Sequence, residues 1–108
     1  MKTINLEDGT TISIGENAQE NWDLIDNSND NWYWFHLKSF PSAHVVLHCD
    51  EPTNEQMIEA ANYCKLATKY RNLKNLKVSV CKIKNIKKAN KIGSVNFVSN
   101  RQVKDIKL

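Results

Sequence analysis

Residues 34–47, WFHLKSFPSAHVVL, constrain the fold more than any other part of the chain. Two alternating runs flank a Pro41-Ser42 turn, which is the pattern of two antiparallel strands and a short connection. Successive side chains of a strand point to opposite faces of the sheet. One face of the predicted hairpin is purely apolar and carries Tyr33, Phe35, Leu37, Val45 and Leu47. The other is mixed and carries Trp34, His36, Lys38, His44, Val46 and His48. We predict that the apolar face is core and that the mixed face binds a partner.

The N-terminal third predicts a second hairpin followed by a helix. Residues 3–6 and 11–14 alternate apolar and polar side chains around Asp8-Gly9, a pair that favours a type I′ turn. Ala18, Trp22 and Ile25 then repeat at helical spacing, which predicts a helix over residues 16–26. Asn17 is expected at the helix N-cap and Asn21 on the helix surface.

The C-terminal half predicts one longer helix and several strands. The helix begins after Pro52, with Thr53 and Gln56 placed as a capping box, and is expected to end near Tyr70. A strand follows over residues 76–81, then a basic loop or strand extension over 82–91, and final strands over 95–98 and 103–107. The predicted fold class is α+β: a single domain over residues 1–108 with an N-terminal β-hairpin, an antiparallel or mixed sheet and two helices.

Charge is distributed very unevenly along the chain. Residues 1–60 carry eleven acids and two bases, and residues 61–108 carry thirteen bases and one acid, Asp105. The halves therefore have net charges of −9 and +12, in agreement with the total of +3. If the fold keeps this separation, one face attracts polyanions. The alternative is that the halves interleave and neutralise one another in surface pairs.

Composition excludes several classes of protein. No apolar run begins the chain, and none approaches the ~20 residues of a membrane span, so we expect neither a signal peptide nor a membrane partner. The three cysteines, Cys49, Cys64 and Cys81, form no Cys-x-x-Cys pair, and their odd number argues against a disulfide framework. We expect reduced, mostly buried thiols in a cytoplasmic protein.

Two groups of residues are candidates for binding nucleic acid. The basic run contains Lys82, Lys84, Lys87, Lys88 and Lys91, which would give salt-dependent contacts to phosphates. In the hairpin, Trp34 could stack on an unpaired base, and His36, Lys38 and His44 could bond a phosphate or a base edge. The structural alternatives are a solvated lysine-rich edge and, for Trp34, ordinary core packing.

The sequence gives little support for a catalytic site or a metal-binding site. His44 and His48 are four residues apart, which separates them by ~13 Å on a strand, too far for one zinc ion. The three glycines form no phosphate-binding loop, and no carboxylate pair has an apolar surrounding. A nucleophilic pair such as Cys81 with His36 would depend on proximity that sequence does not give. We expect no metal, no cofactor, no small-molecule substrate and no enzymatic activity.

The order of several residues resembles a known signature. Trp34, Phe35, His36, Lys38, Pro41, His44, Val45 and Val46 follow the pattern Asp-x-Trp-Phe/Leu-His-x-Lys-x-x-Pro-Gly-Ser-His-Val-Val-Ile of the NFACT RNA-binding domain, the C-terminal module of ribosome quality-control factors. Gly15, Asn17 and Asn21 resemble the start of its first helix. The family's Ala-rich helix is matched by Ala60, Ala61, Tyr63 and Lys65. Its strand with a basic end is matched by Lys84, Ile86, Lys87 and Lys88. Gly93 stands where the family has a Pro-Gly pair before the last strands.

The chain also departs from that pattern. Trp32 stands near the expected acid, Ser42-Ala43 replaces Gly-Ser, and His48 falls near an expected Arg. Ser42-Ala43-His44 and Arg101-Gln102 are closer to the small stand-alone members of the family. Those members usually continue into a C-terminal coiled coil, which we do not expect in this chain.

The resemblance implies binding of structured RNA, tRNA or rRNA, in translation and ribosome quality control. The expected RNA-binding residues are Asn17, Trp34, His36, Lys38, Ser42, His44, Lys82, Lys84, Lys87, Lys88, Lys91 and Arg101. Two alternatives stay open. Either charged half could instead dock on a ribosomal protein or translation factor, or the phosphate contacts could serve DNA, because such contacts alone do not distinguish the sugars.

Overall fold

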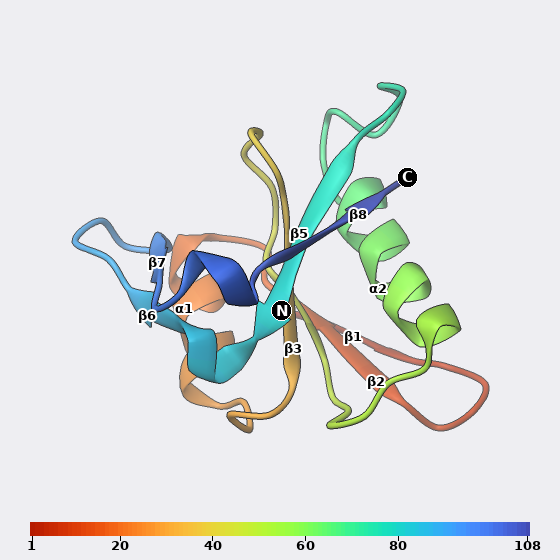
Figure 1. Ribbon diagram of the computed structural model, residues 1–108, viewed down its shortest axis with the longest axis horizontal. Helices are drawn as coiled ribbons and strands as arrows, with labels where there is room; N and C mark the ends of the chain where they lie inside the picture. Colours follow the sequence, from red (N-terminus) through yellow and green to blue (C-terminus); the bar gives the residue numbers. More distant parts are fainter.

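Six antiparallel strands form the central sheet, in the order β1-β2-β4-β3-β5-β8 (Figure 1). The computed structural model describes residues 1–108. The strands of this sheet are β1 (Lys2–Asn5), β2 (Thr11–Ile14), β3 (Tyr33–Leu37), β4 (Val45–Leu47), β5 (Lys77–Lys82) and β8 (Lys104–Lys107). A separate antiparallel pair joins β6 (Ile86–Lys88) to β7 (Val95–Phe97), and the helices are α1 (Ala18–Asp26) and α2 (Asn54–Leu66). The predicted α+β class with its N-terminal hairpin is confirmed.

The turn between β1 and β2 differs from the type I′ turn that Asp8-Gly9 suggested. Gly9 has φ of +89°, but Asp8 is not among the residues with positive φ. The Leu6 carbonyl accepts from Gly9 N at 2.9 Å, and Leu6 N donates to the Thr10 carbonyl at 2.8 Å. The connection is therefore a three-residue loop with glycine at the left-handed position. The Asp8 carboxylate accepts from Thr10 N at 2.9 Å, which favours this longer turn.

Helix α2 covers the apolar face of the sheet, as the side-chain alternation predicted. Its small buried residues Ala60, Ala61 and Cys64 let it lie close to β3 and β4, where Phe35 and Val45 are fully buried. The capping box forms, because Gln56 N donates to the Thr53 hydroxyl and Thr53 N donates to the Gln56 side chain. The box satisfies two backbone donors that the first turn of the helix leaves free.

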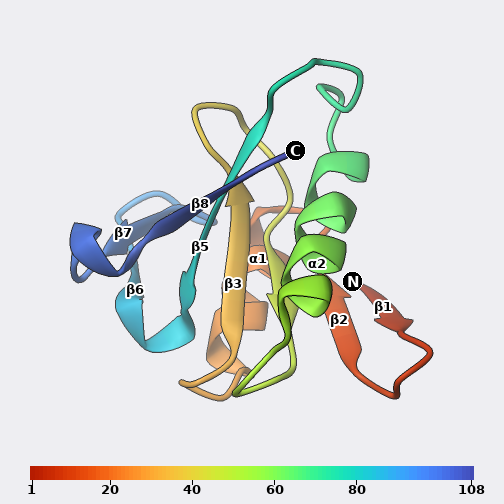
Figure 2. The same ribbon diagram turned by 45° about the vertical axis from the view of Figure 1, so that its right-hand side comes forward.

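The mixed face of the sheet is also covered, which agrees with the alternative of core packing for Trp34. Helix α1 and the β6–β7 pair lie on the side of the sheet away from α2 (Figure 2). A second core cluster forms there from Leu24, Trp34, Val46, Cys81, Ile83 and Ile86. Trp34 is only 2% exposed, so its indole cannot stack on a ligand in this structure. Of the predicted binding face, Trp34, His44 and Val46 are therefore buried, and Lys38 is exposed.

The far end of α2 stops four residues before the predicted position. The helix ends at Leu66, with Ala67 as its C-cap. Thr68 then donates a hydrogen bond to the Pro41 carbonyl at 3.3 Å, and the Tyr70 ring lies 4.7 Å from that of Phe40. These contacts with the β3–β4 connection are tertiary, so helical periodicity could not reveal them.

Few ion pairs join the oppositely charged halves of the chain. Among the eleven acids of the N-terminal half, only Asp26 forms an ion pair with a base of the C-terminal half, Lys88. Extensive surface pairing between the halves is thus not observed. Neither helix is both long and apolar enough to cross a bilayer. The three cysteines are free thiols, of which Cys64 and Cys81 are buried.

Candidate functional site

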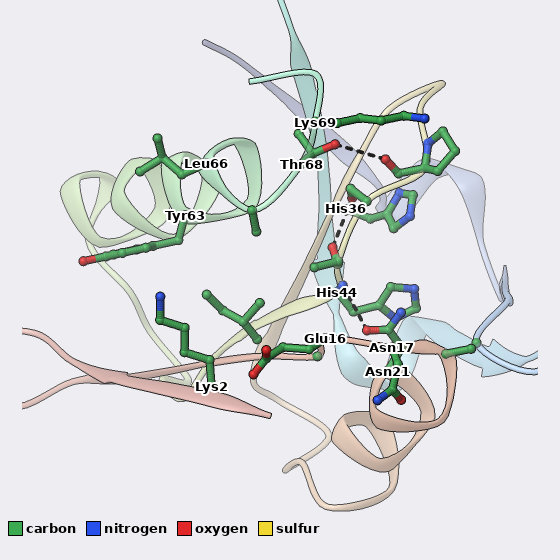
Figure 3. Close-up of a pocket in the computed structure, with 18 of the residues that line it drawn as sticks. Lys2, Glu16, Asn17, Asn21, His36, His44, Tyr63, Leu66, Thr68 and Lys69 are labelled. Atoms are coloured by element: carbon green, nitrogen blue, oxygen red, sulfur yellow. Dashed lines mark hydrogen bonds between the residues drawn. The ribbon is translucent and has the colours of Figure 1, made fainter. Parts of the chain in front are cut away.

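A groove of about 870 Å³ opens where the start of α1, the β3–β4 connection, the end of α2 and the β6–β7 turn meet (Figure 3). We call it the histidine groove. Its lining consists of Lys2, residues 14–18, Asn21, His36, residues 41–44, Tyr63, residues 66–69 and residues 92–94. Four segments that are distant in sequence therefore build one concave surface.

His44 is held at the floor of this groove by both its backbone and its ring. Its carbonyl accepts from Gly15 N at 3.0 Å, and its N–H donates to Asn21 Oδ1 at 3.2 Å. Its ring Nδ1 lies 3.1 Å from Trp34 Nε1, which donates the hydrogen bond because an indole has no acceptor. The buried Trp34 thus acts on the groove indirectly, by orienting His44.

Gly15 and Asn21 form the joint between α1 and the hairpin. A Cβ atom on Gly15 would lie 2.2 Å from Asn21 Oδ1, so only glycine allows that oxygen to reach the His44 backbone. The prediction of Asn21 as a surface residue was wrong, because its side chain bridges two elements. Asn17 is the N-cap of α1, as predicted, and its Oδ1 accepts from Glu20 N at 2.9 Å.

His36 lies beside His44 and is anchored in a different way. Its Nδ1 is 2.6 Å from the Leu37 carbonyl, which can only accept, so Nδ1 donates. Its ring stacks on that of Trp34, with centroids 5.7 Å apart and planes 9° from parallel. The His36 and His44 centroids are 5.3 Å apart, and Figure 3 shows the two rings side by side in the groove.

Both imidazoles are neutral at physiological pH. Burial lowers the pKa of His44 to about 3, with a further contribution from the neighbouring His36. Burial also lowers the pKa of His36, although the bond to the Leu37 carbonyl opposes this shift. A histidine acid–base pair needs one protonated ring. The shifts favour the neutral form of both rings, and each neutral ring offers a hydrogen-bond donor and an acceptor.

Ser42, another predicted binding residue, serves mainly to shape the turn. Its hydroxyl accepts from Leu37 N and donates to the Ala43 carbonyl, both at 3.0 Å. The single hydroxyl proton is thereby used inside the hairpin. Ser42 lines the groove, but its contribution there is to hold the β3–β4 connection in place.

Two of the predicted basic residues are occupied by ion pairs. Lys38 Nζ lies 2.6 Å from Asp105, outside the histidine groove. Lys88 Nζ lies 2.6 Å from Asp26 and 5.3 Å from the centroid of the Trp22 ring. Such exposed pairs are weak, about 0–1 kcal/mol, so they can be exchanged for other partners.

The other basic residues do not join the histidines in one groove. Lys82 and Lys84 line a second groove of about 630 Å³ together with Lys104, Tyr33 and Gln102, which we call the lysine groove. The β6–β7 hairpin connects the two grooves. Its turn, residues 92–94, lines the histidine groove, and its base, Asn85 and Val98, lines the lysine groove. Lys87 and Lys91 on this hairpin are exposed, as is Arg101 in the following 3₁₀ turn.

Sequence reasoning missed two cations of the histidine groove, Lys2 and Lys69. The helix was predicted to continue to about Tyr70 and so to include Lys69, but α2 ends before this residue and the chain turns toward the hairpin. Lys2 belongs to the edge strand β1 and gave no signal at all. The groove is therefore mixed in charge, with Lys2 and Lys69 opposed by Glu16.

The third histidine, His48, and the candidate nucleophile Cys81 do not line the histidine groove. No three side chains of His, Cys, Asp or Glu converge to hold a metal ion. His48 Nε2 lies 2.8 Å from Ser13 Oγ, and its ring stacks on Trp32 with centroids 4.1 Å apart. Burial raises the pKa of Cys81 to about 11, so this thiol is protonated at neutral pH and is a poor nucleophile.

Comparisons with known proteins identify the domain. Residues 3–99 match the model of the NFACT protein RNA binding domain. The chain is 31% identical over 107 residues to the Rqc2 homolog RqcH of Bacillus subtilis (strain 168), a match that covers 95% of this chain and 19% of RqcH. It superposes with a TM-score of 0.89 and 27% identity on the C-terminal part of the fibronectin/fibrinogen-binding protein of Streptococcus suis, covering 99% of this chain and 44% of that one.

These matches agree with the order of the hairpin residues and with the groove that they line. The chain spans about a fifth of the curated relative, so the comparison concerns one domain of a larger protein. The chain belongs to the NFACT protein RNA binding domain family.

Proposed function

We propose that this domain binds RNA through the histidine groove and the exposed basic side chains along the β6–β7 hairpin. The observation that carries the proposal is the convergence of family-signature residues. Gly15, Asn17, His36, His44 and Gly93 are spread over most of the chain, yet all line one groove. The apolar residues of the same signature, such as Phe35, Val45 and Ala60, are buried in the core, whereas these five residues line the groove.

The charge distribution supports a polyanionic ligand. Lys2 and Lys69 line the groove, and Lys87 and Lys91 are exposed on the hairpin that leads to the lysine groove. Only one acid of the N-terminal half pairs with a base of the C-terminal half, so most of the lysines remain available to phosphates. Lysines that contact phosphates supply affinity that does not depend on base sequence.

The RNA we propose is tRNA or rRNA, and the setting is translation and ribosome quality control in the cytoplasm. This setting comes from the similarity to RqcH, which covers 19% of that protein. The proposal therefore concerns one RNA contact and not the activity of the whole relative. The function we propose is binding, and burial raises the pKa of the Cys64 and Cys81 thiols to about 11, which makes them poor nucleophiles.

Binding of the purified domain to tRNA, duplex DNA and a simple polyanion across about 50 to 200 mM salt tests this function. We expect tighter binding to tRNA than to both controls at near-physiological salt. Lys87→Glu should weaken binding to all RNA sequences alike and lower the salt slope by about one. Lys107→Glu, an equal charge change on the far edge strand β8, is the matched control. Equal affinity for all three ligands, with only a weak dependence on salt concentration, would contradict the proposal.

A second candidate function is docking on a basic protein of the ribosome or the translation apparatus. Glu7, Asp8, Glu55 and Glu59 line one shallow depression between the β1–β2 turn and the start of α2. Binding of this kind would survive nuclease treatment and would be weakened by Glu55→Lys or Glu59→Lys, whereas RNA binding would not depend on these acids.

A further inference from the structure

We propose that the floor of the histidine groove recognises the edge of one unpaired RNA base, with His44 Nε2–H donating a hydrogen bond to the base and His36 Nε2 accepting one from it. The proposal rests on the proposed RNA-binding function and names the part of the RNA that this groove takes.

Fixed tautomers give the two histidines complementary roles. Trp34 Nε1 can only donate, so His44 Nδ1 is an acceptor and the proton of the neutral ring resides on Nε2. The Leu37 carbonyl can only accept, so His36 Nδ1 carries the proton and Nε2 is bare. The two rings thus offer one donor and one acceptor, and their centroids are 5.3 Å apart. His44 lines the histidine groove, and His36 lines both this groove and the adjoining depression that contains Lys38.

Both outward nitrogens are available to a ligand. Neither Nε2 atom forms a hydrogen bond within the chain, while both Nδ1 atoms do. No buried side-chain nitrogen or oxygen of the protein lacks a hydrogen-bond partner, so these two Nε2 atoms reach the accessible surface. His44 as a whole is only 3% exposed, which means that its small accessible part opens into the groove that it lines.

The charge at the floor favours a base over a phosphate. The charged and titratable side chains that line the groove with the two histidines are Lys2, Glu16, Tyr63 and Lys69. The cations of the groove are therefore Lys2 and Lys69, while His36 and His44 are neutral. A phosphate is bound best by cations and N–H donors alone, and His36 Nε2 would present it with a lone pair. The edge of an unpaired base presents donors and acceptors together, which this floor matches.

The floor is also rigid enough to select a ligand. Trp34 contacts both rings, stacked on His36 and edge-on to His44. The Phe97 ring also lies edge-on to Trp34, with ring centroids 5.7 Å apart. A hydrogen-bonding pair held by a second layer of side chains is the arrangement that specific recognition requires. The volume of about 870 Å³ lies within the ~300–1,000 Å³ typical of small-ligand pockets, so a single nucleotide fits.

Abasic oligonucleotides separate base recognition from phosphate recognition. A single-stranded RNA and its abasic counterpart carry the same phosphates, so the wild-type domain should bind the abasic strand about tenfold more weakly if it makes one or two base hydrogen bonds. The same pair made as DNA shows whether the sugar matters. Equal affinity for intact and abasic RNA, or binding to the DNA strands only, overturns the proposal.

Asparagine substitutions remove only the outward nitrogens. In His36→Asn and His44→Asn the side-chain amide can replace Nδ1 and keep the inner bond, but nothing replaces Nε2. Each variant should lose about tenfold in affinity for intact RNA and nothing for abasic RNA. His48→Asn is the matched control, because His48 does not line the groove, and it should bind as the wild type does.

The failure modes are distinguishable. RNA binding that is insensitive to His36→Asn, His44→Asn and base removal overturns base recognition and leaves the proposed function standing. No RNA binding above the polyanion control overturns both. If a histidine variant fails to fold, as judged by thermal unfolding, the abasic comparison on the wild-type domain still decides.

A pH series adds an independent readout. Because burial lowers the pKa of His44 to about 3, this ring gains no proton as pH falls from 8 to 6. The loss of RNA affinity caused by His44→Asn should therefore be the same at pH 8 and at pH 6. A steep rise in affinity toward pH 6 that His44→Asn abolishes would indicate an imidazolium–phosphate contact and would overturn the proposal.

Discussion

At the scale of single residues, the most consequential interaction is one hydrogen bond in the core. Trp34 Nε1 donates to His44 Nδ1 at 3.1 Å and so determines which nitrogen of His44 faces the groove. The two histidines would be interchangeable by residue type alone, yet their inner partners give them opposite roles. The tryptophan of the hairpin signature is therefore a positioning residue, which differs from the stacking role that its aromatic ring first suggested.

Replacing Trp34 with phenylalanine tests this role. Trp34→Phe keeps an aromatic ring but leaves His44 Nδ1 without a donor, which should cost about 1–3 kcal/mol of folding free energy. Nitrogen-15 NMR of the imidazoles should show a single Nε2–H tautomer of His44 in the wild type and a mixture in the variant. A wild-type His44 that carries its proton on Nδ1 would contradict this account.

At the scale of secondary-structure elements, the groove depends on how the β6–β7 turn is docked against α1. Gly93 has φ of +84°, and a Cβ atom there would lie 2.9 Å from Ala18. Trp22 Nε1 donates to the Ser94 carbonyl at 2.9 Å and ties the same turn to the helix. This contact brings residues 92–94 to the groove that the start of α1 lines.

Gly9 and Gly93 have nearly equal φ, so substituting each with alanine distinguishes the cost of backbone strain from the cost of displacing the β6–β7 turn from α1. Gly9→Ala and Gly93→Ala should each cost about 1–2 kcal/mol for a left-handed alanine. Only Gly93→Ala also forces a clash, worth about 1–3 kcal/mol more, because nothing lies within 4 Å of a Cβ on Gly9. Chemical unfolding should show the difference, and RNA affinity should fall in Gly93→Ala alone. Equal effects of the two substitutions would show that the docked turn does not matter.

Most elements could be predicted because their signals are local. The alternation in residues 33–37, the Thr53–Gln56 capping box and the Asn17 N-cap each depend on neighbours a few positions away. The early end of α2 could not be predicted, because it depends on Thr68 and Tyr70 contacting the β3–β4 connection. The cover over the mixed face was missed for the same reason, since Ile83 and Ile86 lie within a run that lysines dominate.

At the scale of the whole molecule, the candidate site is an assembly of segments and only part of it could be foreseen. His36 and His44 followed from the hairpin alone, but Lys2 and Lys69 enter the groove through the packing of β1 and α2. Sequence also placed the histidines and the lysine run on one surface, whereas the structure gives them two grooves linked by β6–β7. Linear order does not reveal which face a hairpin turns toward its neighbours.

The central claim is that RNA enters the histidine groove, and NMR titration of the isotopically labelled domain with a small RNA stem–loop tests it most directly. The account predicts that the largest amide shifts fall on Gly15, Asn21, His36, His44 and residues 92–94, with smaller shifts along Lys87 and Lys88. Shifts that cluster instead around Asp8, Glu55 and Glu59, or no shifts at saturating RNA, would contradict it.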